Sequence, residues 1–190
     1  VLACGICGTD KKILNGTFKG FNSYPCILGH EAVGEVIKVG KEVKYLKEGD
    51  YVIPPYIDNP PEGLTTIYGG FSEYAVIHDW KRMDELGIGR HTPAFTDYYQ
   101  IQKTVPNDIN PTSAVMMITL REVLAATRHF GFKAGESIVI FGAGAVGLSF
   151  AKMAKILGMG PVILTDVLSE KEADAELVGA DLFINNREED

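Results

Sequence analysis

The feature that most constrains this 190-residue sequence is a glycine-rich turn between an apolar run and a helical segment. The turn has the form G-x-G-x-x-G and consists of Gly142, Ala143, Gly144, Ala145, Val146 and Gly147. The β-branched run 137–141 predicts a strand before the turn, and residues 145–157 predict a helix after it. Runs at 161–165 and 182–185 predict two more strands, separated by a helix over 169–178. This βαβαβ series predicts a parallel sheet with crossover helices.

The chemistry of this turn suits a dinucleotide. The first glycine permits the tight turn, the second lets a pyrophosphate approach the backbone, and the third lets helix and strand pack closely. Asp166 ends the next strand, 24 residues after Gly142, where a carboxylate binds ribose hydroxyls and favours NAD over a 2′-phosphorylated cofactor. A plain turn of another doubly wound fold is the alternative, but strand, glycines, helix, strand and acid follow the order that a dinucleotide site requires.

The earlier part of the chain has a different pattern. Valine and isoleucine alternate with polar residues over 31–43, and short strands are predicted at 51–53 and 71–77. A helix is predicted from Pro111 to about Phe130, with proline in its first turn. We therefore expect a mostly β domain over 1–110, a connecting helix within 111–135 and a partial α/β domain over 136–190.

Three cysteines leave two interpretations of the C-x-x-C formed by Cys4 and Cys7. One is a thioredoxin-like redox pair, and the other is half of a zinc knuckle. Only Cys26 remains as a further cysteine, so a closed four-thiolate site is excluded. His30 and Glu31 are adjacent, and His30 follows Cys7 by 23 residues. These three residues can form an open mixed-ligand zinc site if the fold gathers them, and a satisfied surface histidine is the alternative.

Composition restricts the class of partner and the compartment. The formal net charge is −7, from 18 basic and 25 acidic residues, which argues against a nucleic-acid partner. No apolar run approaches the ~18–20 residues that cross a bilayer, so no membrane partner is expected. Three cysteines cannot form a disulfide framework, and we expect a cytoplasmic location. The start at Val1 is unlike an initiator or a signal peptide, so we expect a piece of a larger protein.

Five motifs together resemble the zinc-dependent medium-chain alcohol and polyol dehydrogenases. They follow the family's order along nearly the whole chain and are GICGTD (5–10), ILGHEAVGEV (27–36), GDYV (49–52), GFSEY (70–74) and GAGAVG (142–147). The resemblance implies a mostly β GroES-like catalytic domain joined to the first half of a Rossmann doubly wound parallel sheet. It also implies a cytoplasmic oxidoreductase that transfers hydride between NAD and an alcohol or polyol. A homodimer or homotetramer is expected of the full-length protein.

The resemblance also implies roles for individual residues. The catalytic-zinc positions are Cys7, His30 and Glu31, with Glu31 a direct or exchangeable ligand. Thr9 falls where a hydroxyl relays the substrate proton. Cys4 lies outside the family's zinc set and is expected in the core.

The cofactor side of the resemblance rests on the turn Gly142 to Gly147, on Asp166 and on Lys171. Asp166 falls on the acid that binds the ribose, and Lys171 matches a basic residue that contacts the same sugar. Two other functions remain open for such a chain. One is a zinc-free quinone or enoyl reductase of the same superfamily, and the other is a nucleotide-binding relative without catalysis.

The sequence departs from the family at three places. Residues 54–68 stand where the family has a lobe with four cysteines around a structural zinc, and none of them is cysteine. We therefore expect one catalytic zinc and no structural zinc. Met117 and Ile118 occupy the position of a further zinc ligand, and the nearest carboxylate is Glu122, which we expect to be a surface or packing residue. Lys12 replaces a histidine that passes protons to solvent. The family also continues beyond residue 190.

Overall fold

The computed structural model describes residues 1–187. The chain divides into two compact units, Val1–Ile118 and Thr119–Asp190. The division lies inside the segment 111–135, where the sequence predicts a connecting helix. That segment forms two successive helices, α4 (Pro111–Ala114) and α5 (Met116–His129). Among the described residues, no helix has both the length and the apolar character needed to cross a membrane.

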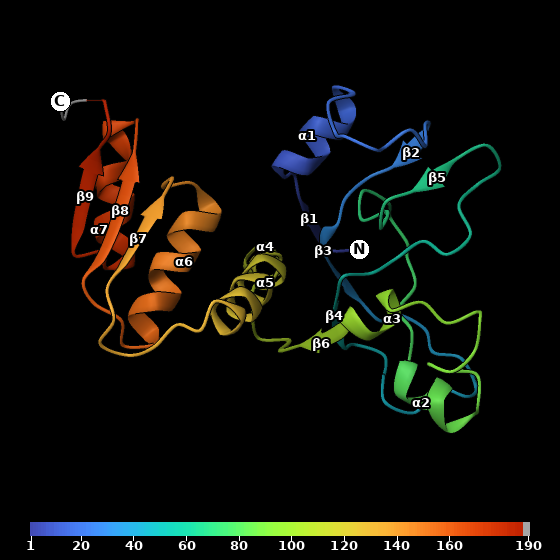
Figure 1. The fold of residues 1–190 in the computed structure, drawn as a ribbon. Helices are drawn as coiled ribbons and strands as arrows, with labels where there is room; N and C mark the ends of the chain where they lie inside the picture. Colours follow the sequence, from blue (N-terminus) through green and yellow to red (C-terminus); the bar gives the residue numbers. More distant parts are fainter. Residues whose placement is uncertain (188–190) are drawn as a thin grey trace. The chain divides into compact units, whose positions relative to one another are not determined.

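The first unit is built on an antiparallel sheet with the strand order β1-β3-β4-β6 (Figure 1). Its strands are β1 (Ala3–Gly5), β3 (Glu31–Glu35), β4 (Tyr51–Ile53) and β6 (Lys103–Val105). A parallel pair consists of β2 (Cys26–Ile27) and β5 (Thr65–Thr66). Short helices complete the unit, namely α1 (Gly8–Leu14), α2 (Trp80–Glu85) and α3 (Tyr98–Ile101). The buried core of this unit includes Val33, Ile53, Val105, Val115 and Ile118.

The prediction of a strand at 71–77 is wrong, since the structure forms only an isolated bridge there, between Tyr56 and Val76. The alternation of apolar and polar side chains is present, but the backbone bends. The Ser72 hydroxyl lies 2.6 Å from the Gly69 carbonyl oxygen and 2.9 Å from that of Tyr74. These local hydrogen bonds compete with a regular ladder.

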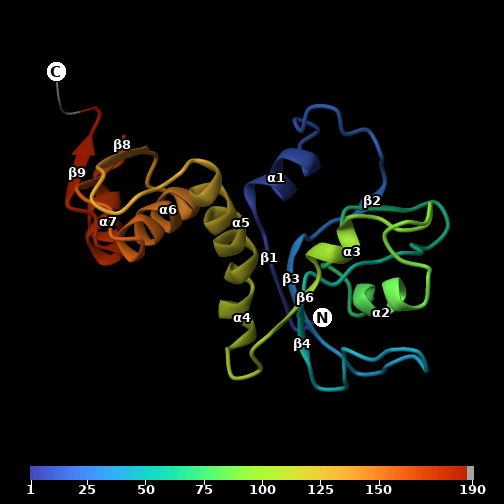
Figure 2. The same ribbon diagram turned by 60° about the horizontal axis from the view of Figure 1, so that its bottom comes forward.

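The second unit confirms the predicted βαβαβ order. Its parallel sheet has the order β7-β8-β9, and α6 and α7 pack against the sheet and against each other (Figures 1 and 2). The elements are β7 (Ile138–Phe141), α6 (Ala145–Ile156), β8 (Val162–Asp166), the 3-10 turn η1 (Ser169–Lys171), α7 (Glu172–Val178) and β9 (Leu182–Asn185). Alanine side chains at 151, 154 and 175 let the helices approach Val162 and Leu164 closely.

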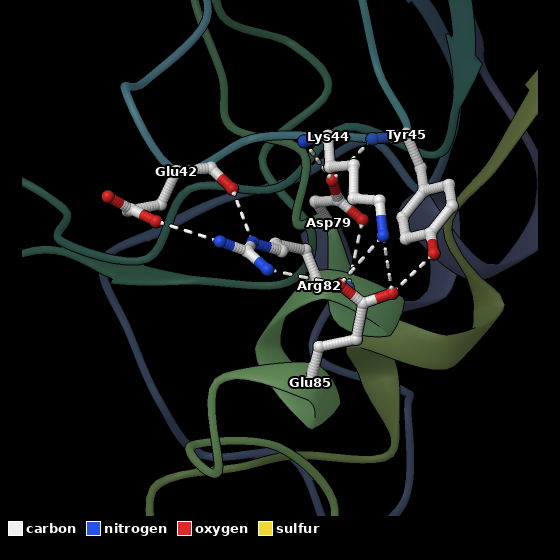
Figure 3. A network of polar contacts seen from close by, with 6 residues as sticks. All are labelled: Glu42, Lys44, Tyr45, Asp79, Arg82 and Glu85. Carbon is white, nitrogen blue, oxygen red and sulfur yellow. Dashed lines mark hydrogen bonds and ion pairs between the residues drawn. The ribbon is translucent and has the colours of Figure 1, made fainter.

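A polar network joins α2 to the loop that precedes β4 (Figure 3). Asp79 accepts hydrogen bonds from the backbone N–H groups of Lys44 and Tyr45, both at 2.7 Å, and from that of Arg82 at 3.2 Å. The second anchor is Glu85, which bonds the Tyr45 hydroxyl, Lys44 and Arg82. These three donors, that of Tyr45 first, lower the pKa of Glu85 to about 2. The network fixes the helix by both ends.

Gln102 fixes the end of α3 through its buried amide. Its side chain is 3% exposed. The amide nitrogen donates to the carbonyl oxygens of Pro54 and Val76 at 3.0 and 3.1 Å. The amide oxygen accepts from the His78 backbone N–H at 2.9 Å and lies 2.8 Å from the His78 Nδ1. One side chain thereby links three segments of the first unit.

We expect Gln102→Leu to lower the free energy of unfolding by about 1–3 kcal/mol, because it removes the hydrogen bonds that join the end of α3 to two other segments and leaves the His78 backbone N–H without this acceptor. Chemical denaturation measures the change. Gln100→Leu is the matched control, because Gln100 makes one surface hydrogen bond, to Asp97 at 3.3 Å. Equal losses of unfolding free energy in Gln102→Leu and Gln100→Leu would contradict the structural role assigned to the Gln102 amide.

Candidate functional site

The start of α1 brings a thiol and a carboxylate together. Cys7 is the N-cap, and its Sγ accepts from the backbone N–H of Thr9 at 3.2 Å. A second hydrogen bond joins the same turn, since the Asp10 Oδ2 accepts from the Cys7 backbone N–H at 2.9 Å. This reciprocal pair is a capping box with cysteine in the place usually taken by serine or threonine. The carboxylate is therefore fixed beside the sulfur.

His30 reaches the same place from the start of β3. The preceding Gly29 has φ 98°, and a Cβ there would lie 2.6 Å from the Phe71 nitrogen and 2.9 Å from the Cys4 sulfur. Glycine is required at this close approach. The His30 Nε2 consequently lies 3.5 Å from the Cys7 Sγ.

Three candidate ligand atoms, from Cys7, Asp10 and His30, all lie within 4.8 Å of one another. Asp10 is 4% exposed, and its Oδ1 is buried without a hydrogen-bond partner in the described part of the chain. That oxygen lies 3.9 Å from the His30 Nδ1. Sequence reasoning missed Asp10, although its i+3 spacing from Cys7 is that of a capping box.

This cluster fits a zinc ion. Zinc binds thiolate sulfur at about 2.3 Å and imidazole nitrogen at about 2.0–2.1 Å, so a tetrahedral centre separates the two atoms by about 3.5 Å. The sulfur and the Nε2 lie at 3.5 Å. The Nδ1 faces the unpartnered Asp10 oxygen, as in sites where a carboxylate orients a metal-binding histidine. A cation would also compensate the buried carboxylate.

Glu31, the other predicted ligand, takes a different position. It begins β3 opposite Gly5 of β1, and its Oε2 lies 3.0 Å from where a Gly5 Cβ would be. Among the described residues, the compact ligand group includes Asp10 and not Glu31. Thr9 is half-buried in the first turn of α1, next to Cys7.

Cys4 is a half-buried free thiol. Burial first, and then the negative charges of Asp10 and Glu31, raise its pKa to about 11. Redox-active C-x-x-C thiols have lowered pKa values instead, so these surroundings favour the core role over the redox pair.

The position of the further zinc ligand is occupied by the apolar core. Ile118 is 3% exposed and packs in the core of the first unit, and Met117 packs against the same cluster. Glu122 is exposed and lies in the second unit. It borders a surface hollow together with Thr119, Val123, Ala126, Val146 and Phe150.

The glycine-rich turn has the geometry that its sequence predicts. Gly142 follows β7 with φ 98°. A Cβ on Gly147 would collide with the Gly142 carbonyl oxygen, so only glycine lets α6 begin this close to the strand. Gly144 caps α6 without a side-chain hydrogen bond. The start of the helix thus presents backbone N–H groups and a positive dipole end, which suit a phosphate.

Asp166 lies at the carboxyl end of β8, beside this turn. Its Oδ2 accepts from the Ala143 N–H at 2.7 Å, and its Oδ1 accepts from those of Val167 and Leu168 at 2.7 and 3.2 Å. The bond from Ala143 is the main cause of the lowered pKa of Asp166, so the carboxylate is charged at neutral pH. Lys171, the other predicted ribose contact, forms an ion pair with Asp174 at 3.0 Å.

Comparisons with known proteins find one matching family and several similar proteins and structures. The family described as the alcohol dehydrogenase GroES-like domain matches residues 1–84. Alcohol dehydrogenase-like 3 of Arabidopsis thaliana is 31% identical over 218 residues, which cover 99% of this chain and 55% of that protein. A structure described as a zinc-binding dehydrogenase of Sinorhizobium meliloti 1021 bound to NADP has 27% identity and a TM-score of 0.76, covering 100% of this chain and 54% of its own.

Galactitol-1-phosphate dehydrogenase of Escherichia coli is also similar, with 25% identity and a TM-score of 0.73 over 98% of this chain and 53% of that one. The chain is similar to zinc-dependent medium-chain dehydrogenases over nearly its whole length. It spans about half the length of the curated relatives it matches.

We expect Asp10→Asn to weaken zinc binding about 10- to 100-fold, because the variant keeps a cap acceptor but removes the charge that faces His30. Competition with a chromophoric chelator measures the dissociation constant. Glu122→Gln is the control and should bind zinc as the parent does. A loss in Glu122→Gln as large as that in His30→Ala would instead identify Glu122 as a ligand.

Proposed function

We propose that this chain contributes the catalytic zinc site and the dinucleotide-binding turn of a dehydrogenase that transfers hydride between NAD and an alcohol or polyol. The observation that carries the proposal is the cluster of Cys7, His30 and the buried Asp10 carboxylate, whose Oδ1 has no hydrogen-bond partner in the described part of the chain. The same chain holds a glycine turn and an acid suited to a dinucleotide. Relatives described as alcohol, mannitol and galactitol-1-phosphate dehydrogenases support this class of substrate.

The first unit supplies the groups for the substrate side of the reaction. When bound, zinc supplies Lewis-acid chemistry at an alcohol or carbonyl oxygen, and the nicotinamide supplies hydride chemistry. Cys7 and His30 provide thiolate and imidazole donors, with Glu31 as a direct or exchangeable third ligand. Asp10 orients the imidazole through Nδ1. The Thr9 hydroxyl relays the substrate proton, because it accepts that proton while it gives up its own to water.

The second unit holds the cofactor. N–H groups of the turn from Gly142 to Gly147 bind the pyrophosphate at the start of α6. Asp166 has charge and acceptor capacity left for the ribose hydroxyls, since each carboxylate oxygen accepts more than one hydrogen bond. We keep Lys171 as a ribose contact, which requires it to leave Asp174. A cytoplasmic location and a homo-oligomeric state of the whole protein also belong to this proposal.

A zinc-free reductase is the second candidate, and one observation favours it. Ile118 fills the position of a zinc ligand with a buried apolar side chain, which leaves the metal with fewer protein donors. Metal content separates the two candidates.

Elemental analysis of the protein expressed from its natural gene should return one zinc per chain, because residues 54–68 lack the cysteines of a second site. NADH formation at 340 nm with a panel of secondary alcohols and polyols should require that zinc. Two tightly bound zinc ions would contradict the one-site expectation, and turnover of enones by metal-free protein would favour the reductase.

Cofactor preference provides a separate prediction. We expect NAD to bind at least about tenfold more tightly than NADP, about 1.4 kcal/mol, because the Asp166 carboxylate repels a 2′-phosphate. Asp166→Asn should narrow the difference while retaining an acceptor for the Ala143 N–H. Fluorescence titration of the reduced cofactors measures both constants. Equal or tighter binding of NADP by the parent protein would refute the preference, and the NADP-bound relative makes this a necessary test.

A further inference from the structure

Tyr68 has an unusual backbone conformation beside the zinc-binding cluster. Among residues 1–187 it is the non-glycine residue with a positive φ, 66°. A bulky side chain rarely adopts this left-handed region, so surrounding contacts must hold it there. The Tyr68 carbonyl accepts from the Ile57 N–H at 3.0 Å, and the Gly70 N–H donates to the Gly29 carbonyl at 2.7 Å. The turn is therefore tied directly to the residue before His30.

The strained backbone places the Tyr68 ring against the imidazole of His30. The two ring centroids are 5.7 Å apart, with a tilt of 48°. The Tyr68 ring also meets Tyr98 in a T-shaped contact with ring centroids 4.8 Å apart, and the Tyr98 and Tyr56 ring centroids are 4.4 Å apart. We call Tyr56, Tyr68 and Tyr98 the aromatic ledge. It is a continuous row of rings that ends at a residue of the zinc site.

The outer part of the ledge is fixed by helix α3. The Tyr98 hydroxyl lies 3.4 Å from the carbonyl oxygens of Pro54 and Pro55, which are its acceptors. The next side chain, Tyr99, stacks on His78 with ring centroids 3.7 Å apart, and the Gln102 amide secures the end of the helix. The Tyr98 hydroxyl thus bonds to the backbone. The ring of Tyr98 packs against the ring of Tyr68.

We propose that Tyr68, backed by Tyr98, is a specificity-determining residue that favours alcohols with a planar or apolar carbon skeleton over polyols. The inference rests on the proposed function, since it assumes that the alcohol oxygen is held at the Cys7–His30 cluster. An aromatic ring beside that point packs well against an aromatic or aliphatic skeleton. A polyol would leave hydroxyl groups against the same face without hydrogen-bond partners, which is costly.

Steady-state kinetics with benzyl alcohol and xylitol test the proposal in the protein expressed from its natural gene. The parent should have the higher kcat/KM for benzyl alcohol. Tyr68→Asn should lower that value about tenfold or more, because the loss of an apolar contact in a substrate pocket has effects of this size. The kcat/KM of Tyr68→Asn for xylitol should stay within about threefold of the parent's value. Asparagine tolerates positive φ, so the variant keeps the turn.

Two variants serve as controls. Tyr68→Phe keeps the ring and should retain the benzyl alcohol preference. Tyr74→Ala removes an exposed tyrosine, 65% accessible, from the same segment and should leave both values unchanged. Ligand-observed NMR of benzyl alcohol supplies a readout independent of turnover, and its dissociation constant should rise in Tyr68→Asn alone.

The outcomes separate the two levels of the hypothesis. A parent that oxidises neither these two alcohols nor any member of the panel of secondary alcohols and polyols overturns the proposed function and this inference together, whereas activity on the panel without activity on benzyl alcohol overturns the inference alone. A parent that oxidises alcohols but prefers xylitol overturns the inference and leaves the proposed function intact. The inference is also overturned, and the proposed function left intact, if Tyr68→Asn changes kcat/KM for both alcohols by the same factor or leaves both values unchanged. If Tyr68→Asn loses its fold by thermal unfolding, Tyr68→Gly, which suits the same φ, takes its place in the comparison.

Discussion

The candidate metal site depends on the pair of hydrogen bonds between Cys7 and Asp10. A short helix such as α1 has little stability of its own, and its first N–H groups need acceptors. The Cys7 sulfur and the Asp10 carboxylate satisfy that need. The same two bonds orient both groups toward His30, so local helix capping and the geometry of the cluster have one origin.

A second constraint is the contact between two loops that are distant in the sequence. Gly29 and Gly70 meet so closely that a Cβ on Gly70 would lie 2.6 Å from the Gly29 carbonyl oxygen. This contact places the turn 68–71 against the residue that precedes His30. Together with the hydrogen bonds of Ser72, it accounts for the bend where the sequence predicts a strand over 71–77, and it also brings Tyr68 to the imidazole.

The parts that could be predicted from the sequence are those that depend on local pattern. The strand, glycine turn and helix around Gly142 repeat a short-range signal, and the structure forms them there. The pairing of Cys7 with His30 followed from the resemblance, because spacing alone left a surface histidine open. Asp10 was missed for a different reason. Its significance depends on the burial of one carboxylate oxygen beside His30, and such burial produces no periodic pattern in the sequence. The roles of Glu31, Thr9 and Lys171 remain predictions.

The hydrogen bonds of Asp166 affect how a nucleotide would be received. Before any ligand arrives, its carboxylate already joins the end of one parallel strand to the Ala143 amide of the neighbouring turn. The loss of conformational entropy on ordering these two loops has therefore occurred during folding. A dinucleotide would meet a receptor of nearly final shape, and less of its binding free energy would be spent on organising the protein.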